Sequence, residues 1–261
     1  MLEPPTQPSL LLLGHGSSKH PESSQSVRMH ADLLRERGNF QSVDVAFLKE
    51  EPRLENVAAQ LTCLPDEEVG NLTIVPDFLA EGYFTLQVIP SMLRMDTLPD
   101  SVRYISPVGT HAMMQDLIYQ AAKDVLGDWC ERDVTLLLVG HGSTKNPRSK
   151  ETLMQHIEGL KTSSAYGQIC DLWLEESPFV NEWRDVANHD KVLVVPFLLN
   201  DGQHGGWDIP EMLGLPEGDP VHGHTHELGG RHVRVAPALG TSHRFADVIE
   251  EVALLDRALR S

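Results

Sequence analysis

Histidines beside glycines occupy corresponding places in the two halves of the chain. His15 and His141 each lie in a Gly-His-Gly-Ser motif that directly follows a short run of leucine and valine. His204 lies in a glycine-rich segment after another apolar run of the second half, and Glu175 directly follows a further apolar run. Imidazole titrates near neutral pH and binds Fe2+ and Co2+, and a nearby carboxylate can orient it or take up a proton. These residue types therefore favour chemistry that involves a divalent metal and protons.

The two motifs are part of a longer repeat. Ser9–Pro21 and Thr135–Pro147 are 13 residues each and are identical at nine positions. Two further pairs of segments match in the same order, namely Val75–Leu93 with Val195–Leu213 and Val102–Ile118 with Val233–Ile249. Three collinear matches indicate a tandem duplication. We therefore expect two domains, residues 1–127 and residues 128–261.

Each half alternates short apolar runs with amphipathic stretches of helical length. In the first half we expect strands at Leu10–Leu13, Val43–Leu48, Leu72–Pro76 and Val102–Ser106, and helices at Glu22–Arg37, Pro52–Leu61, Thr85–Leu93 and His111–Leu126. In the second half we expect strands at Val134–Val139, Ile169–Leu174, Val192–Pro196 and Val233–Ala236. This alternation predicts an α/β fold of two doubly wound lobes, each a parallel sheet with helices on both faces.

The predicted topology brings the candidate residues together. In open parallel sheets, ligands bind outside the carboxyl ends of the strands. His141, Glu175 and His204 each follow a strand of the second half, so we expect them to share one rim of its sheet. Two such lobes facing each other would leave a cleft suited to a large flat ligand.

Composition narrows the class of protein. The 261 residues carry 21 Lys and Arg against 38 Asp and Glu, a formal net charge of −17. An acidic chain without a basic patch is a poor ligand for nucleic acid and for membrane surfaces. The three cysteines are odd in number and widely spaced, which excludes a disulfide framework and a CxxC metal site. The longest early apolar run, Leu10–Leu13, is too short for a signal sequence or a membrane span. We expect a cytoplasmic protein.

The duplicated GHGS motif and the segment Gly202-Gln-His-Gly-Gly-Trp-Asp-Ile-Pro resemble the class II tetrapyrrole chelatases, specifically the long CbiX/SirB-type sirohydrochlorin chelatases. The resemblance covers essentially the whole chain. It implies a lyase that inserts Co2+ or Fe2+ into sirohydrochlorin, in cobalamin or sirohaem biosynthesis, without ATP. It also implies that the metal is a substrate and that no cofactor is bound permanently.

The resemblance assigns site residues as well. Family members use a histidine after the first strand, a histidine in the loop after the third strand and often a glutamate after the second. The second half has all three, as His141, His204 and Glu175, with the two histidines as metal ligands. In the first half only His15 remains, because Lys49 stands at the position of Glu175 and Phe84 at that of His204. The resemblance therefore implies an active second half and a degenerate site in the first.

Small and basic residues near these histidines are candidates for substrate binding. Glycine allows the backbone to approach a planar ligand closely. The candidates are Gly140, Gly142, Ser143 and Gly202, with Lys145 and Arg148 just past the second GHGS motif. The two cations, with Lys150 beside them, could offset the repulsion between an acidic protein and a substrate with eight carboxylates. The alternative is an ordinary solvated helix face.

The second half also carries 11 extra residues between Pro210 and Val233, compared with the first half. They include alternating histidines, His222, His224 and His226. Alternating histidines on an extended loop can collect a divalent metal for delivery. The alternative is a polar, solvated loop.

Other enzyme classes fit poorly. Gly14 and Gly140 precede the motif histidines where histidine phosphatases need arginine, and the chain has neither a G-x-S-x-G elbow nor a G-x-x-x-x-G-K-[ST] loop. The alternative that stays is a non-catalytic carrier of tetrapyrrole or metal that keeps the chelatase fold. Histidine and glutamate bind Co2+, Fe2+ and Ni2+ alike, so the residues do not identify which of these metals is used in vivo. A duplicated chain can supply both lobes by itself, and we favour a monomer.

Overall fold

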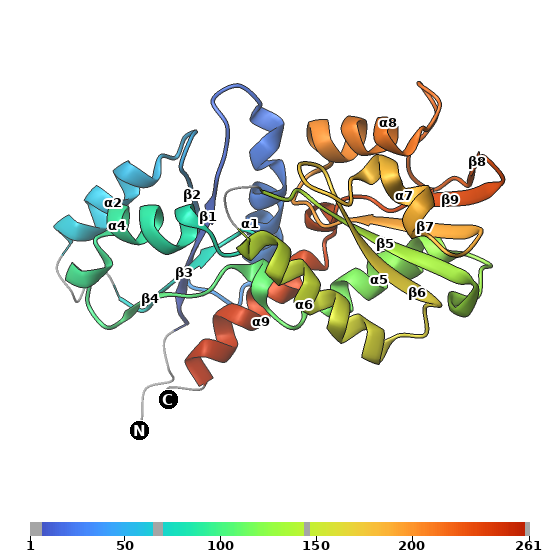
Figure 1. The fold of residues 1–261 in the computed structure, drawn as a ribbon. Helices are drawn as coiled ribbons and strands as arrows, with labels where there is room; N and C mark the ends of the chain where they lie inside the picture. Colours follow the sequence, from blue (N-terminus) through green and yellow to red (C-terminus); the bar gives the residue numbers. More distant parts are fainter. Residues whose placement is uncertain (1–6, 65–69, 144–146, 259–261) are drawn as a thin grey trace. The chain divides into compact units, whose positions relative to one another are not determined.

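The computed structural model describes residues 7–64, 70–143 and 147–258. The chain divides into two compact units, whose elements are labelled in Figure 1. The first unit comprises Met1–His111 and His243–Ser261, and the second comprises Ala112–Ser242. Both units are α/β, as the sequence predicts.

The first unit contains a four-stranded parallel sheet. Its strands are β1 (Ser9–Gly14), β2 (Val43–Phe47), β3 (Leu72–Pro76) and β4 (Val102–Tyr104), in the order β2-β1-β3-β4. The leucines of β1 are buried, as expected for a central strand covered on both faces. All four strands lie within two residues of the predicted bounds.

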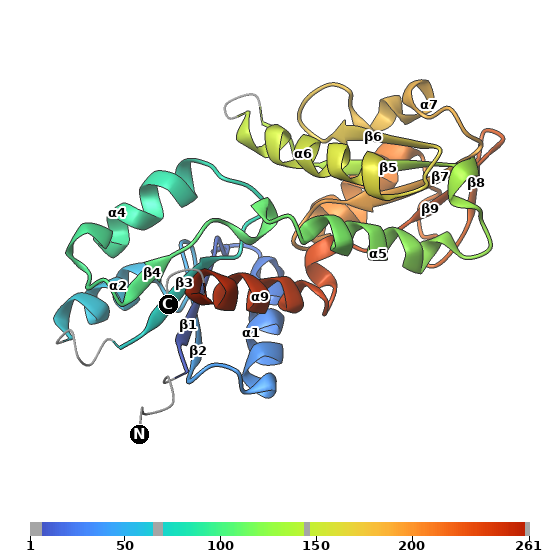
Figure 2. The same cartoon turned by 90° about the horizontal axis from the view of Figure 1, so that it is seen from below.

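Helices cover both faces of this sheet. They are α1 (Gln25–Arg37), α2 (Leu54–Cys63), α4 (Ile89–Leu93) and α9 (Phe245–Ala258). Figures 1 and 2 show α2 and α4 on one side of the sheet and α1 and α9 on the other. The predicted helix Thr85–Leu93 is a π-helical segment, Phe84–Val88, that continues into α4.

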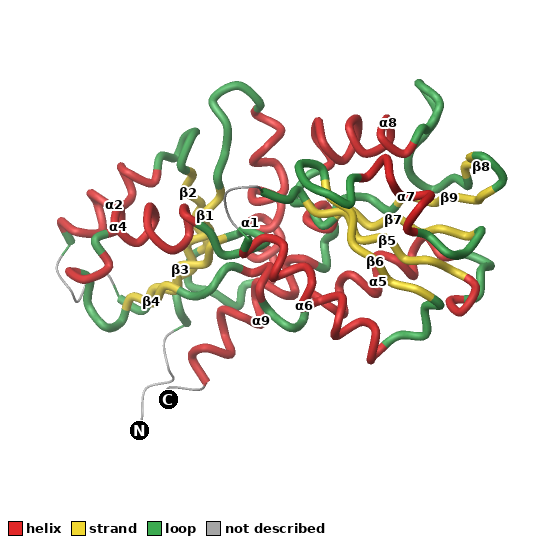
Figure 3. Tube along the Cα trace, viewed as in Figure 1, coloured by secondary structure: helices red, strands yellow, loops and turns green. Residues whose placement is uncertain are grey.

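The second unit contains a five-stranded sheet. Its strands are β5 (Val134–Gly140), β6 (Gln168–Trp173), β7 (Lys191–Pro196), β8 (His226–Leu228) and β9 (Arg231–Val235), in the order β6-β5-β7-β9-β8. Four strands are parallel and match the predicted ones. The fifth, β8, pairs with β9 in the antiparallel direction and comes from the residues that the first half lacks. The tube in Figure 3 shows β8 and β9 as neighbouring strands joined by a tight turn.

The helices of the second unit are α5 (Met114–Leu126), α6 (Arg148–Ser163), α7 (Trp183–Val186) and α8 (Ile209–Leu213). A π-helical segment, Asp201–Asp208, leads directly into α8. The core of this unit joins Leu137, Val194 and Val235 of the sheet to Trp183 and Ile209 of the helices.

The compact units divide the chain differently from the predicted domains 1–127 and 128–261. Helix α5 ends the first sequence repeat, yet it packs against β7 and α6 in the second unit. Helix α9 ends the second repeat, yet it contacts α1 and β3 in the first unit. The two repeats therefore exchange their last helices. The boundary near residue 127 describes the duplication in the sequence, whereas the packing changes unit at residues 111/112 and 242/243.

A buried polar pair connects α9 to the first unit. The His30 Nδ1 atom on α1 lies 2.7 Å from the Asp77 Oδ2 atom, just after β3, and both side chains are fully buried. The first residue of α9, Phe245, stacks on the His30 ring with centroids 4.7 Å apart and planes inclined by 6°. The exchanged helix thus covers a buried ionisable pair.

Glu131 connects α5 to the second unit. Its carboxylate accepts hydrogen bonds from the Tyr119 hydroxyl at 2.9 Å, the Lys123 ammonium at 3.0 Å and the Ala165 backbone N–H at 3.2 Å. Burial opposes ionisation of Glu131, but the hydrogen bonds from Lys123, Tyr119 and Ala165 outweigh it and lower the pKa of the carboxyl group. The ionised glutamate therefore stabilises the exchanged position of α5.

The three cysteines, Cys63, Cys130 and Cys170, are free thiols. Within the described ranges, no helix is both long and apolar enough to cross a membrane.

Candidate functional site

His141 directly follows β5, at the carboxyl end of the central strand of its sheet. Its Nδ1 atom lies 3.1 Å from the carbonyl oxygen of Gly142. Because a carbonyl oxygen only accepts hydrogen bonds, Nδ1 is protonated, and in the neutral ring the lone pair is then on Nε2. The side chain is partly exposed, so this lone pair belongs to an accessible imidazole.

His204 lies in the π-helical segment that leads into α8. Its Nδ1 atom is 2.6 Å from the Oδ2 atom of Asp208, four residues further along the chain. The carboxylate accepts a hydrogen bond from Nδ1–H, so in the neutral ring the lone pair of His204 is on Nε2 as well. This is the arrangement in which a carboxylate orients a histidine toward a metal. Asp208 belongs to the Asp-Ile-Pro motif but was not among the predicted site residues; its i,i+4 spacing from His204 is the sequence signal for the pair.

The two imidazoles contact each other. Their ring centroids are 5.0 Å apart and their planes are inclined by 88°, an edge-to-face arrangement. The structure therefore brings together the two histidines that the sequence predicts as metal ligands. Among the residues that the structure describes, no group of three or more His, Cys, Asp or Glu side chains is arranged to hold a metal ion.

Glu175 and its neighbour Glu176 have different environments. The backbone N–H of Glu175 donates to the carbonyl oxygen of His141 at 3.0 Å, and its Oε2 atom lies 3.9 Å from Nδ1 of that histidine. Glu176 instead accepts a hydrogen bond from the Ser143 backbone N–H at 3.1 Å and pairs with the Lys150 ammonium at 3.3 Å. Glu175 is therefore the glutamate beside His141, and Glu176 stabilises the loop after β5.

At two of the glycines predicted to bind substrate, the local structure itself requires glycine. A Cβ atom on Gly140 would lie 2.3 Å from the Trp173 ring, so this glycine is needed for the packing of β5 against β6. Gly202 has a φ of 35° and nothing within 4 Å of where a Cβ would be, so it is needed for the backbone turn into the π-helical segment. Gly142 and Ser143 lie in the loop that carries His141.

The first unit repeats this framework with different side chains. The Nδ1 atom of His15 lies 2.8 Å from the carbonyl oxygen of Gly16, and the Lys49 backbone N–H donates to the His15 carbonyl at 2.9 Å. The His15 ring contacts Phe84 with centroids 5.1 Å apart and planes inclined by 77°. The positions assigned to Lys49 and Phe84 by the sequence alignment are thus equivalent in space to Glu175 and His204.

The predicted basic residues differ in their surroundings. Lys145 lies outside the described residues. Arg148 is exposed at the start of α6. Lys150 pairs with Glu176 and lies 5.2 Å from the centroid of the Trp173 ring, so its ammonium group already has an ionic partner.

The three alternating histidines are not brought together. His226 is buried in β8, and its Nε2 atom lies 3.4 Å from the Val221 carbonyl oxygen. The Nδ1 atom of His222 lies 3.3 Å from the Val235 carbonyl oxygen, while His224 is exposed. The extra residues therefore form a loop that holds His222 and His224 and leads into the edge strand β8, which begins at His226.

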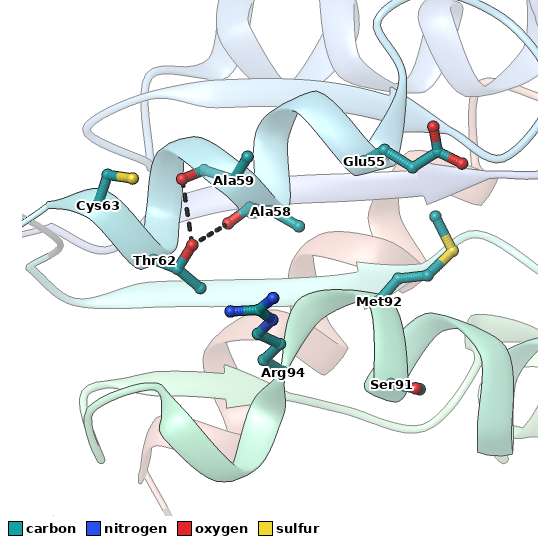
Figure 4. Close-up of a pocket in the computed structure, with 8 residues that line it drawn as sticks. All are labelled: Glu55, Ala58, Ala59, Thr62, Cys63, Ser91, Met92 and Arg94. Carbon is teal, nitrogen blue, oxygen red and sulfur yellow. Dashed lines mark hydrogen bonds between the residues drawn. The ribbon is translucent and has the colours of Figure 1, made fainter.

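Two surface pockets lie outside the histidine pair. In the first unit, a pocket of about 400 Å³ lies between α2 and α4. Figure 4 shows its lining, which is Glu55, Ala58, Ala59, Thr62, Cys63, Ser91, Met92 and Arg94. In the second unit, a pocket of about 450 Å³ is lined by Gly206, Trp207 and Pro210, among others, and so adjoins the segment that carries His204.

Two α/β units with histidines at equivalent strand ends, one of them completed by a second histidine and a glutamate, define a duplicated protein of the class II chelatase type. The chain belongs to the CbiX family, whose profile matches residues 9–125 and 135–254. The two matched segments coincide with the repeats of the sequence.

Individual relatives agree with this assignment. The chain is 35% identical to a probable sirohydrochlorin cobaltochelatase of Halobacterium salinarum over 269 aligned residues, which cover 94% of this chain and 90% of the relative. A multi-domain protein of Deinococcus radiodurans with structural similarity to chelatases has a TM-score of 0.75 and 26% identity. That match covers 95% of this chain but only 55% of the Deinococcus protein. SirB from Bacillus subtilis, solved with Fe3+, shares the fold at a TM-score of 0.72 and 16% identity, covering 97% of this chain and 98% of SirB.

Proposed function

We propose that this protein is a sirohydrochlorin chelatase that inserts Co2+ or Fe2+ into the macrocycle without ATP. The observation that carries the proposal is the pair His141 and His204. Each ring donates a hydrogen bond from Nδ1–H to an oxygen acceptor, which places the lone pair of the neutral ring on Nε2, and the two rings contact each other. The 35% identity to a probable sirohydrochlorin cobaltochelatase supports the choice of substrate.

The reaction makes two demands on the protein. The divalent metal must exchange water for ring nitrogens, and two macrocycle N–H groups must each lose a proton. In this proposal, the Nε2 atoms of His141 and His204 bind the incoming metal, because neutral imidazole is a good ligand for Fe2+ and Co2+. As the metal passes to the macrocycle, the same nitrogen atoms become available as proton acceptors.

Glu175 has a supporting role in this scheme. Its Oε2 atom lies 3.9 Å from Nδ1 of His141, close enough for its charge to stabilise the imidazolium that forms when Nε2 takes up a proton. It is also exposed, so it can pass a proton to solvent. We propose His141, His204 and Glu175 as the catalytic residues, with Gly142, Ser143 and Arg148 nearest to the substrate.

We further infer that the metal enters only as a substrate and that no cofactor is bound permanently. Each side chain needed for binding the metal and accepting protons is supplied by the second unit. The three free cysteines fit a reducing compartment such as the cytoplasm. We propose a monomer, because the duplicated chain contains both units.

The proposal is tested by mixing sirohydrochlorin anaerobically with Co2+ or Fe2+ and following the absorbance change, after subtraction of the spontaneous rate. His141→Ala and His204→Ala are expected to fall to the spontaneous rate. His15→Ala is the matched control, since it removes the equivalent imidazole of the first unit, and it is expected to keep most of the activity. An inactive His15→Ala together with an active His204→Ala would place the reaction in the first unit. Binding of sirohydrochlorin without any rate above the blank would instead show a carrier.

A further inference from the structure

The degenerate site of the first unit is an exposed aromatic surface. Phe84 lies between His15 and Tyr83, with ring centroids 5.1 Å and 5.8 Å away respectively. Tyr83 is 64% exposed, Phe84 38% and Leu86 43%. Large apolar side chains gathered at the surface mark a binding surface more often than isolated ones do. We call Lys49, Tyr83, Phe84 and Leu86 the aromatic site.

The backbone of the aromatic site matches that of the proposed catalytic site. The hydrogen bond from the Lys49 N–H to the His15 carbonyl, 2.9 Å, corresponds to that from Glu175 to His141, 3.0 Å. The ring pairs correspond as well, at 5.1 Å and 77° for the first unit and 5.0 Å and 88° for the second. The two sites therefore differ in chemistry and not in framework.

Each difference removes a function that metal insertion needs. Phe84 in place of His204 removes a metal ligand, and Val88 in place of Asp208 removes the carboxylate that would orient it. Lys49 in place of Glu175 replaces a proton acceptor with a cation. The result is one imidazole in contact with Phe84, which itself contacts Tyr83, and an exposed lysine whose backbone is hydrogen-bonded to that of His15.

This set of groups suits a flat, anionic ring system. Aromatic side chains pack against a planar π-system by stacking or by edge-to-face contact. An exposed ammonium group attracts carboxylates on the rim of such a ring. The attraction matters because the chain has a net charge of −17, which repels a polycarboxylate at long range.

We propose that the aromatic site binds the carboxylate-bearing tetrapyrrole itself and takes no part in handling the metal. The macrocycle packs on Phe84, Tyr83 and Leu86, and one of its carboxylates pairs with Lys49. The duplication has then yielded one site for metal insertion and one for ring binding. The choice of a tetrapyrrole as ligand rests on the proposed function.

The test is a titration of the full chain with metal-free sirohydrochlorin, followed by the change in absorbance of the macrocycle. Tyr83→Ala/Phe84→Ala is expected to raise Kd about tenfold, because two aromatic contacts are lost. Lys49→Glu is expected to weaken binding most at low salt, where charge repulsion is least screened. Leu64→Ala is the control, since Leu64 is also exposed in the first unit but lies outside the aromatic site. An unchanged Kd in both site variants would overturn the proposal.

Two further measurements separate this proposal from the proposed function. In metal insertion, His204→Ala should abolish kcat, whereas in the titration with the metal-free ring it should leave Kd at the wild-type value. If the wild type shows no insertion but the aromatic-site variants still bind the ring tenfold more weakly, the ring-binding proposal stands and the proposed function fails. If circular dichroism shows that the double variant is misfolded, the titration is repeated with Tyr83→Ala alone. Tyr83 is chosen because its side chain is more exposed than those of Phe84 and Leu86. A Kd for Tyr83→Ala equal to that of the wild type then refutes the proposal.

Discussion

Replacing Asp208 with asparagine is expected to slow metal insertion about tenfold. The carboxylate fixes the tautomer of His204 through a 2.6 Å hydrogen bond to Nδ1. A hydrogen bond to a charged group contributes about 1.5–3 kcal/mol, and we take the lower end because the two side chains are partly exposed, His204 at 47% and Asp208 at 29%. About 1.4 kcal/mol corresponds to a factor of ten in rate. Asparagine keeps the shape of the side chain but loses the charge that holds the proton on Nδ1.

The measurement is kcat/KM for Co2+ at saturating sirohydrochlorin, under anaerobic conditions and after subtraction of the spontaneous rate. Glu211→Gln is the matched control, because it removes one negative charge from an exposed position of α8, one turn beyond Asp208. The control should match the wild type. If Asp208→Asn stays within twofold of the wild type, or if Glu211→Gln is equally slow, the carboxylate does not position His204 and our account of the tautomer is wrong.

Three further predictions concern stability and are measured by urea denaturation. Glu131→Gln should lower the free energy of unfolding by about 1–3 kcal/mol at pH 7. Because the folded pKa of Glu131 lies below the unfolded value of about 4.3, its contribution is present above that pH and is lost as the pH falls through the folded pKa; a deficit that persists undiminished at pH 3 would contradict this. Gly140→Ala should cost about 1–3 kcal/mol through the clash with Trp173, and an unchanged midpoint would show that the ring can move aside. Asp77→Ala should cost about 3–5 kcal/mol because it breaks the buried pair with His30, and a cost below 1 kcal/mol would refute a structural role for the pair.

Much of the local structure could be predicted from the sequence. The apolar run Leu10–Leu13 predicts a strand covered on both faces, and its counterpart within Val134–Val139 extends the prediction to the second unit. The Gly-His-Gly-Ser motif then places a histidine at each strand end. Since side chains at the carboxyl ends of neighbouring parallel strands meet, the contact between His141 and His204 follows from topology.

Other features depend on contacts that no local pattern encodes. The helical period of α5 identifies the buried face, with Leu117 and Ile118, but does not say which sheet that face covers. The exchange of α5 and α9 was therefore missed. Glu175 and Glu176 are adjacent, and only the hydrogen bonds to Ser143 and Lys150 distinguish the structural glutamate from the one beside His141.

The exchange of the last helices has a consequence for synthesis of the chain. The second unit is one continuous segment, residues 112–242, whereas the first unit needs residues at both ends of the chain. During translation, domains generally fold as soon as they are complete. The second unit is complete when residue 242 has left the ribosome. At that point α9, whose first residue Phe245 stacks on His30, has not yet been synthesised, so the pair of His30 and Asp77 is not yet covered. The first unit thus starts earlier in the sequence but is completed later, and the unit with the proposed catalytic histidines forms before it.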